Sequence, residues 1–309
     1  MTAPSWQARL LNPLLKYTVK PVLFPRIATP LRMRLTARAF AQVEKLRPSP
    51  ARAQFEPVLE ADFAGEWVST GKPTDRVLLY FHGGGYMIMS PRGYRDFTAA
   101  LAQAFSARVL AVDYRQGADY PWPAPLHDAL ASYDWLLDQG IAPENIILGG
   151  DSAGGHLTLS TLLAIRDLDL PMPRGGIALS PWANMGCDFL SHDANRDSDV
   201  LLDLQAVRSN AAFQCQGSDA RDPVNSPAFA DYHGLPPLHI VASTSEILLD
   251  DARAVRDAAL AAGVEVDYRE WEGMPHAFPI FYPLLPEAQA AVDDMAGFAT
   301  RLFSHKLSD

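Results

Sequence analysis

A serine in a tight turn between a strand and a helix limits how this chain can fold. Gly150-Asp-Ser-Ala-Gly154 fits the pattern Gly-x-Ser-x-Gly, follows directly on the apolar stretch 145–149 and runs into a helical stretch. Such a turn is sharp enough to need small residues two positions either side of Ser152, and it lifts the hydroxyl above the edge of a sheet. The pattern therefore predicts a nucleophile. The alternative is a phosphate-binding glycine turn, but the chain has no Gly-x-Gly-x-x-Gly and no lysine follows these glycines.

The rest of the chain alternates between strand and helix patterns. Short apolar runs predict buried strands, and stretches with apolar residues at helical spacing separate them. This alternation predicts an α/β fold, with a mostly parallel sheet of about eight strands flanked by helices and an antiparallel pair at its start. The expected strands are residues 55–60, 63–69, 76–82, 108–113, 145–149, 176–180, 238–243 and 264–269, and the expected helices are about 94–105, 125–139, 153–165, 247–261 and 287–303.

The predicted organisation is one catalytic domain with a cap formed by two separate segments. The segment 183–234 breaks the alternation and lacks strand runs, so we expect an inserted helical cap there. Residues 51–182 and 235–309 are expected to form the two parts of the core. Residues 1–50 are expected to form N-terminal cap helices.

Composition excludes several classes of protein. With 48% hydrophobic and 20% charged residues over 309 positions, the chain is neither disordered nor fibrous. A net charge of −10 argues against nucleic acid as a partner, because phosphate binding needs a basic face. The longest stretch without Asp, Glu, Lys or Arg, Val77–Pro91, has 15 residues, short of the ~18–20 that span a bilayer. Two cysteines, Cys187 and Cys215, suit a reducing compartment, so we expect a cytoplasmic protein without a zinc site.

The first fifty residues differ from the remainder in charge. Nine Lys and Arg against Glu44 alone give residues 1–50 a charge of +8, so the remaining residues carry −18. Apolar residues interleaved with arginines over 31–43 predict amphipathic helices, which either pack on the core or lie at a membrane surface. A secretory signal is not expected, because the apolar stretch Leu10–Leu15 is interrupted by polar and proline residues and no small-residue cleavage site follows. An organelle transit peptide is a weaker alternative.

Three consecutive glycines follow an earlier buried strand, in His82-Gly-Gly-Gly-Tyr86. Acyl transfer places negative charge on a carbonyl oxygen, and each fixed N–H donor lowers the barrier by about 2.7–4 kcal/mol. Glycine lets the backbone approach closely, so we expect the amides of Gly84, Gly85 and Ala153 to form an oxyanion hole. His82 is expected to orient this loop by hydrogen bonding, and the alternative is that it acts as the base.

The expected base and acid lie near the end of the chain, because one common serine-hydrolase architecture has the order Ser, then Asp or Glu, then His. His276 follows the last expected strand and precedes the closing helix. Glu246 comes directly after the strand ending at Ser243 and is the preferred acid. Asp250 and Asp251 fall about one turn into the next helix and are the alternatives. Either carboxylate type can hold the imidazole in the required tautomer.

Together these motifs resemble the hormone-sensitive-lipase-like esterases, which are microbial carboxylesterases of the α/β-hydrolase fold. Over about residues 60–305, the resemblance includes the serine turn, the glycine run and three shorter motifs: Val112-Asp-Tyr-Arg115, Ser180-Pro-Trp182 and Gly273-Met-Pro-His276. The resemblance implies a cap made from N-terminal helices plus an insertion after the sixth strand, and an activity that needs no metal or cofactor. It implies these roles: Ser152 as nucleophile, His276 as base, and Gly84, Gly85 and Ala153 as oxyanion donors.

The chain departs from the family pattern at two places. The family often has Asp-Pro-Leu-Arg-Asp where this chain has Glu246-Ile-Leu-Leu-Asp250, so the acid position falls on a longer side chain. After Tyr114-Arg115 relatives usually continue Leu-Ala-Pro-Glu, whereas this chain has Gln116-Gly-Ala-Asp119. That loop lies near the mouth of the active site in relatives, so we expect the substrate fit to differ here.

The predicted reaction is hydrolysis of small carboxylic esters with short- to medium-length chains, through an acyl-enzyme. The alternatives are a lactone hydrolase or amidase with the same residues, or a catalytically inactive ligand-binding receptor on the same fold. Weak contact of residues 1–50 with a membrane surface, and a homodimer, are left open as further partners. The aromatic and sulfur-containing side chains expected near substrate, with ordinary core packing as the alternative, are Tyr86, Met87, Trp182, Met185, Phe213 and Phe278.

Overall fold

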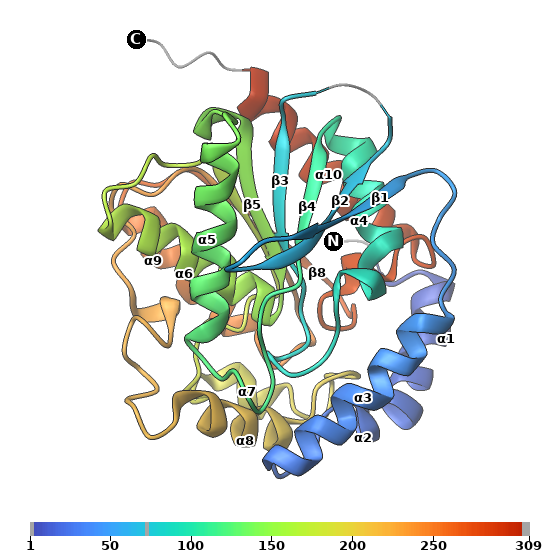
Figure 1. Cartoon of the computed structure of the whole chain (residues 1–309). Coiled ribbons are helices and arrows are strands. Elements are labelled where there is room, and N and C mark those ends of the chain that lie inside the picture. Colours follow the sequence, from blue (N-terminus) through green and yellow to red (C-terminus); the bar gives the residue numbers. More distant parts are fainter. Residues whose placement is uncertain (1–2, 72–73, 305–309) are drawn as a thin grey trace.

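One eight-stranded sheet forms the centre of the computed structural model, which describes residues 3–71 and 74–304 (Figure 1). The strand order is β1-β2-β4-β3-β5-β6-β7-β8. β1 and β4 each pair antiparallel with β2, and the other neighbours are parallel. The predicted mostly parallel sheet of eight strands is confirmed. The strands are β1 (Gln54–Leu59), β2 (Ala64–Ser69), β3 (Val77–Phe81), β4 (Arg108–Val112), β5 (Ile146–Asp151), β6 (Gly175–Leu179), β7 (Leu238–Ser243) and β8 (Val266–Trp271).

Helices cover both faces of this sheet (Figure 1). The five predicted core helices are α4, α5, α6, α9 and α10, and α4 begins earlier than expected because Pro91 fits the first turn of a helix. The α-helices are α1 (Trp6–Leu14), α2 (Lys20–Leu23), α3 (Pro30–Leu46), α4 (Pro91–Phe105), α5 (Ala124–Asp138), α6 (Ala153–Asp167), α7 (Leu190–Ala194), α8 (Leu204–Cys215), α9 (Leu249–Ala261) and α10 (Pro286–Ser304). Shorter helical turns are η1 (Leu15–Val19), η2 (Pro143–Asn145), η3 (Pro227–Phe229) and η4 (Phe278–Phe281).

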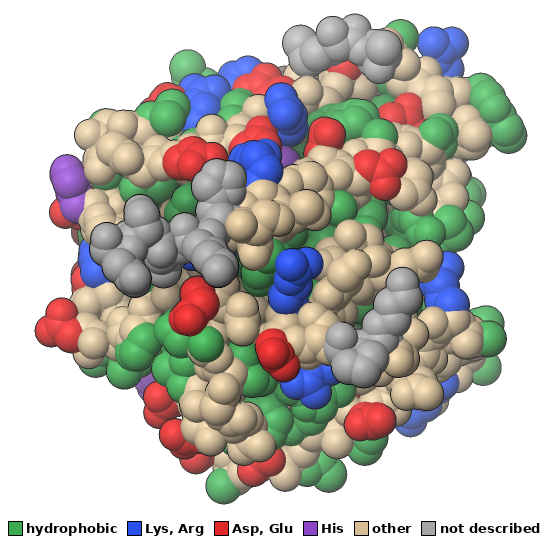
Figure 2. Space-filling model, turned by 90° about the horizontal axis from the view of Figure 1, so that it is seen from above, with side chains coloured by type: hydrophobic (Ala, Val, Ile, Leu, Met, Phe, Trp, Pro, Cys, Tyr) green, Lys and Arg blue, Asp and Glu red, His purple; other side chains and the backbone are tan. Residues whose placement is uncertain are grey.

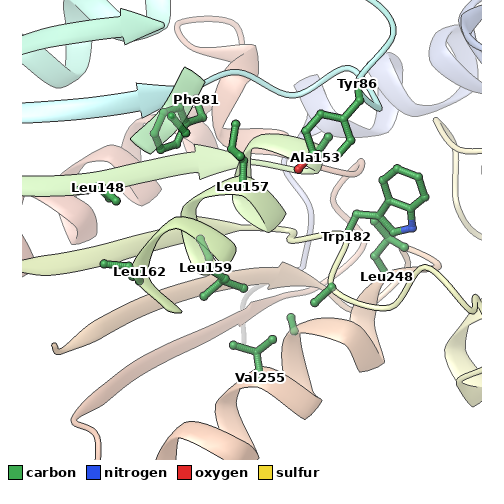
Figure 3. Close-up of a cluster of buried hydrophobic side chains, with 14 of the residues drawn as sticks. Phe81, Tyr86, Leu148, Ala153, Leu157, Leu159, Leu162, Trp182, Leu248 and Val255 are labelled. Carbon is green, nitrogen blue, oxygen red and sulfur yellow. The ribbon is translucent and has the colours of Figure 1, made fainter. Parts of the chain in front are cut away.

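The hydrophobic core lies in two layers, one on each face of the sheet. In β3, Val77, Leu79 and Phe81 belong to the layer that packs against α5, α6 and α9. Leu78 and Tyr80 point to the opposite layer, which packs against α4 and α10. Every residue of this strand is therefore buried, which explains why it is continuously apolar rather than alternating. Figure 3 shows part of the first layer, where side chains of α6 lie between the sheet and α9.

The two irregular segments lie on one side of the sheet. All of 183–234 is described, and it contains α7, α8 and η3 but no strand. In Figure 1, α7 and α8 lie below the sheet, and α1, α2 and α3 lie below it and to the right. None of the helices in the described part of the chain has both the length and the apolar character needed to cross a membrane.

Candidate active site

Ser152 occupies a strained turn between the end of β5 and the start of α6. Its φ of 56° and ψ of −118° lie in a region that residues with a side chain rarely adopt. A Cβ at Gly150 would lie 2.6 Å from the carbonyl oxygen of Phe81, and a Cβ at Gly154 would lie 2.6 Å from that of His82. Because atoms cannot approach so closely, both positions require glycine, as the sequence pattern predicts.

The glycine loop after β3 has amide groups without hydrogen-bond partners. Gly84 and Gly85 have positive φ values of 110° and 65°. The N–H groups of Gly84, Gly85 and Ala153 donate no hydrogen bond to any described residue, whereas Gly83 donates to Asp151 Oδ1 at 3.0 Å. Gly84 and Gly85 each line a cavity that also reaches the serine. Three N–H donors beside Ser152 are therefore available to a bound group, and they are the amides for which the sequence predicts an oxyanion hole.

Asp151, which the sequence analysis passed over, connects the serine turn to this loop. Its buried carboxylate accepts hydrogen bonds from the hydroxyls of Tyr80 (2.7 Å) and Tyr94 (2.8 Å) and from the Gly83 amide (3.0 Å). Burial raises the pKa of Asp151 to about 6. Its position directly before Ser152 in the Gly-x-Ser-x-Gly motif is the sequence feature that could have indicated a role at the site.

His82, the other histidine considered as a base, belongs to the same loop. Its Nδ1 lies 2.7 Å from the carbonyl oxygen of Gly83, which can only accept, so Nδ1 carries the proton. The ring stacks on Tyr114 with centroids 4.4 Å apart. Burial lowers the pKa of His82 to about 4, so the ring is neutral near pH 7. These contacts fit the orienting role that the sequence favours.

His276 and Glu246 form a buried pair. Glu246 Oε2 lies 2.6 Å from His276 Nδ1, and Oε1 accepts hydrogen bonds from the Ser243 amide (2.7 Å) and the Ser180 hydroxyl (2.9 Å). Burial alone would lower the pKa of His276, but the hydrogen bond and charge of Glu246, together with the charges of Asp199 and Asp151, outweigh it and raise that pKa. His276 Nε2 has no hydrogen-bond partner in the described part of the chain, and the ring lines the same cavity as Ser152.

The two alternative acids lie elsewhere. Asp250 accepts from the Ser191 amide at 2.9 Å and pairs with Arg253. Asp251 accepts from the Asn184 amide at 2.7 Å. Among the three carboxylates, only Glu246 contacts His276.

A further buried carboxylate, Asp199, connects the segment 183–234 to the loop that carries Glu246. Its Oδ2 accepts from the Ile247 amide at 2.9 Å, and its Oδ1 accepts from the amides of Leu201 and Leu202 at 2.8 Å. Ile247 follows Glu246, and both leucines line the cavity beside Ser152. Asp199 therefore fixes the loop that carries Glu246 relative to two residues of the cavity wall, and no sequence pattern indicates this role.

Two cavities reach Ser152, and they differ greatly in size. The larger has a volume of about 460 Å³ and is also lined by His276. The smaller, of about 20 Å³, lies by Gly85 and Trp182. A volume of ~10–15 Å³ on this measure holds one water molecule, so the smaller cavity accepts only a small group. The N-terminal residues that line the larger cavity are apolar except for Arg47: Leu15, Val19, Leu23, Phe24, Phe40 and Arg47.

Only one of the side chains expected near substrate lines these cavities, and that is Trp182. The other five do not line either cavity: Tyr86, Met87, Met185, Phe213 and Phe278. Tyr86 shows the reason, because its ring is fully buried beside Trp182 (Figure 3) and its hydroxyl lies 2.6 Å from Nδ1 of His156. Tyr86 and Phe278 are both fully buried, which fits the alternative of core packing for these two side chains. Met87 instead lines a separate cavity beneath α3.

The inner face of the N-terminal helices was missed as part of the site. Leu11, Leu15, Val19 and Leu23 follow one another at four-residue spacing, and all four pack against the core. That spacing indicates a helix, but amphipathic helices were predicted from such spacing only for 31–43.

No cluster of three His, Cys, Asp or Glu side chains suited to a metal ion occurs among the described residues.

Comparison with known proteins assigns this arrangement to one class, the α/β hydrolases: residues 78–280 match the family described as alpha/beta hydrolase fold. An acetyl-hydrolase from Streptomyces hygroscopicus is 42% identical over 233 residues, which are 75% of this chain and 78% of the relative. A crystal structure of an esterase from the bacterial hormone-sensitive lipase family matches with a TM-score of 0.89 and 35% identity, over 98% of this chain and 100% of that chain. The chain belongs to the hormone-sensitive-lipase family of α/β hydrolases.

The crystal structure of EstE5, soaked with p-nitrophenyl butyrate, is also similar. Its TM-score is 0.89 at 34% identity, and the match covers 97% of this chain and 100% of that chain. The similarity extends over the N-terminal helices and the inserted segment as well as the sheet, because so little of either chain is left out. The two solved structures therefore share the whole architecture with this chain and not only the sheet.

Proposed function

We propose that this protein is a serine carboxylesterase in which Ser152, Glu246 and His276 form the catalytic triad. The observation that carries the proposal is the buried 2.6 Å contact between Glu246 and His276, with the other ring nitrogen unpartnered on a cavity shared with Ser152. The N–H groups proposed as the oxyanion hole are those of Gly84, Gly85 and Ala153.

The proposed reaction runs in two halves. Glu246 keeps the proton of the neutral ring on Nδ1, so Nε2 of His276 can take the proton of the Ser152 hydroxyl. The serine oxygen attacks the ester carbonyl, and the amides of the glycine loop stabilise the charge on the carbonyl oxygen. His276 then protonates the departing alcohol. Water repeats the sequence on the acyl-enzyme and releases the acid. The interactions that raise the pKa of His276 also stabilise the imidazolium that forms in each half of the reaction.

We propose a substrate with a small group on one side of the ester and a larger apolar group on the other side. The support is the pair of cavities at Ser152, of about 20 and 460 Å³. The names of the relatives agree, since one is an acetyl-hydrolase and another was soaked with p-nitrophenyl butyrate. Small carboxylic esters of short to medium chain length fit this shape.

Two series of esters test the function and the substrate shape together. In p-nitrophenyl esters the acyl chain is lengthened, and in alkyl acetates the alcohol is lengthened. We expect kcat/KM to fall steeply in one series and to remain high in the other, because only one side of the serine has room. Lactones and anilides are assayed alongside; a higher kcat/KM on either would replace carboxylesterase by lactone hydrolase or amidase. No turnover of any of them would indicate a ligand-binding receptor.

We further propose that residues 1–50 and 183–234 act as one cap over a core formed by 51–182 and 235–309. The support is that both segments contribute side chains to the larger cavity, such as Phe40 from the first and Leu202 from the second. A cytoplasmic location and a homodimer stay predictions from the sequence. Fractionation of the expressing cells and sedimentation equilibrium measure them.

A further inference from the structure

The helix that begins the chain is apolar on two opposite faces. Trp6, Leu10, Leu14 and Tyr17 follow one another at spacings of four, four and three residues along α1 and η1, so they share a face. Each is more than half exposed. Leu15, which packs into the core, lies on the face opposite to them. The outer stripe is thus additional to the apolar residues that hold the helix to the protein.

α3 repeats this arrangement. Leu31, Leu35, Val43 and Leu46 lie at helical spacing and are each more than half exposed, while Met33 is fully buried on the inner side. Surface helices of globular proteins normally carry polar residues on the outer face. We call these eight exposed side chains of α1, η1 and α3 the outer apolar stripes: Trp6, Leu10, Leu14, Tyr17, Leu31, Leu35, Val43 and Leu46.

Polar contacts on the inner side fix both helices in this orientation. At the start of α1, Ser5 donates from its amide (2.6 Å) and its hydroxyl (2.9 Å) to the carboxylate of Glu287. In α3, the buried carboxylate of Glu44 accepts from the amide (3.0 Å) and the hydroxyl (2.8 Å) of Ser90. The outer apolar stripes therefore face outward because the inner faces are held by specific partners.

The segment that carries the outer apolar stripes is also positively charged. Three of the nine cations in residues 1–50 pair with carboxylates of the body, through Arg26, Arg34 and Arg47. The other six have no carboxylate partner among the described residues. Of these, Arg9, Lys16 and Lys20 donate hydrogen bonds to backbone carbonyls (3.0, 2.7 and 2.6 Å), which leaves Arg32, Arg38 and Lys45 as the unpaired cations in the described part of the chain. On the face seen from above in Figure 2, opposite to these helices, acidic and basic side chains are instead interspersed. Apolar side chains flanked by unpaired cations are the pattern of helices that lie in an anionic membrane interface.

We propose that the outer apolar stripes dock on an anionic lipid surface, with the unpaired cations at the headgroups and the acidic body directed away from it. The separation of charge, +8 in residues 1–50 and −18 in the remainder, orients the molecule this way. A two-fold dimer through the stripes would bring two such segments of +8 together. The charge complementarity therefore favours an anionic surface over a second copy.

This docking would also place the larger cavity close to the lipid. Leu15, Val19 and Leu23 on the inner face of the docked helices line that cavity, and the exposed side chain of Leu284 lies on its wall. If the proposed esterase function holds, an amphipathic ester could pass from the lipid surface into the cavity. The docking itself does not depend on catalysis.

Flotation of the full chain with vesicles tests the proposal. We expect the protein to float with vesicles of phosphatidylcholine mixed with phosphatidylglycerol, not with phosphatidylcholine alone, and to dissociate as salt is added. Each Lys or Arg near an anionic surface contributes about 1 kcal/mol, so Arg32→Gln and Arg38→Gln should each weaken binding about fivefold. Leu10→Ser combined with Leu35→Ser should abolish flotation. The matched control is Leu168→Ser with Leu260→Ser, which are equally exposed leucines outside the stripes and should change nothing.

Two measurements separate the possible outcomes. All of these variants should hydrolyse a water-soluble p-nitrophenyl ester at the normal rate, which shows that they are folded. Ser152→Ala should float as the unmodified chain does, so a failure of the proposed function leaves the docking test intact. No flotation with the anionic vesicles, or equal flotation with both compositions, overturns the proposal. So does a dimer that dissociates on Leu10→Ser with Leu35→Ser in the absence of vesicle binding.

Discussion

Replacing Glu246 by glutamine tests the acid in a way that the geometry makes specific. The Ser243 amide can only donate, and it lies 2.7 Å from Oε1. A glutamine must therefore place its carbonyl oxygen there and its NH₂ group opposite Nδ1 of His276. Since the NH₂ group can only donate, Nδ1 must then accept and the ring proton moves to Nε2. The ring nitrogen that should take the proton of Ser152 is then already protonated.

We expect Glu246→Gln to lower kcat by about 10⁴-fold, the effect of the wrong histidine tautomer in a serine hydrolase. This corresponds to about 5.5 kcal/mol of activation free energy. The assay is hydrolysis of a p-nitrophenyl ester at saturating concentration, with KM changing little. Circular dichroism checks that the variant is folded.

The pH profile gives a second readout. The rate requires a neutral His276, so activity rises with pH through its pKa, which the carboxylate of Glu246 raises above 6.5. Removing that charge leaves burial as the larger influence, so the rising limb should move to lower pH in the variant. Asp250→Asn is the control, because Asp250 contacts Ser191 and Arg253 and not the histidine. If Glu246→Gln keeps a tenth of the activity, or if Asp250→Asn lowers kcat more than Glu246→Gln does, Glu246 is not the acid.

Three further substitutions, with Gly297→Ala as a control, test the turn, the loop and the cavity. Gly154→Ala should lower the unfolding free energy by about 2–3 kcal/mol, because the added Cβ collides with backbone atoms. Gly297→Ala in α10 has open space around it and should raise the unfolding free energy by about 0.5–1 kcal/mol. Thermal melts measure both changes. Asp151→Asn leaves at least one of its donors unpaired, so we expect a loss of about 1–3 kcal/mol of stability and a fall in kcat larger than the change in KM. Phe24→Ala, on the wall of both cavities, should shift chain-length preference toward longer esters in the two ester series.

Local sequence was enough to predict the sheet and the turn that carries Ser152. Each strand of the sheet interior is a short apolar run because both of its faces are buried, and that pattern is visible without tertiary structure. The glycines around the serine are also readable, since the collisions at Gly150 and Gly154 involve backbone that any such turn brings close.

The parts that were missed depend on contacts between distant segments. Asp199 contacts Ile247 only because the segment 183–234 folds back onto the loop after β7, and no spacing in the chain indicates it. Met87 and Phe213 were expected near substrate because of their type, but side-chain type does not specify which way a loop or helix turns. Phe24 lines the site instead, from a segment more than a hundred residues before Ser152.

The central claim is that Ser152 is the nucleophile, and covalent labelling tests it most directly. A fluorophosphonate reacts with the activated serine of such an enzyme, and mass spectrometry of the digested protein locates the adduct. We predict one adduct, on Ser152, with complete loss of esterase activity, and no adduct on Ser152→Ala. Labelling of a different serine, or full activity in Ser152→Ala, would contradict the account.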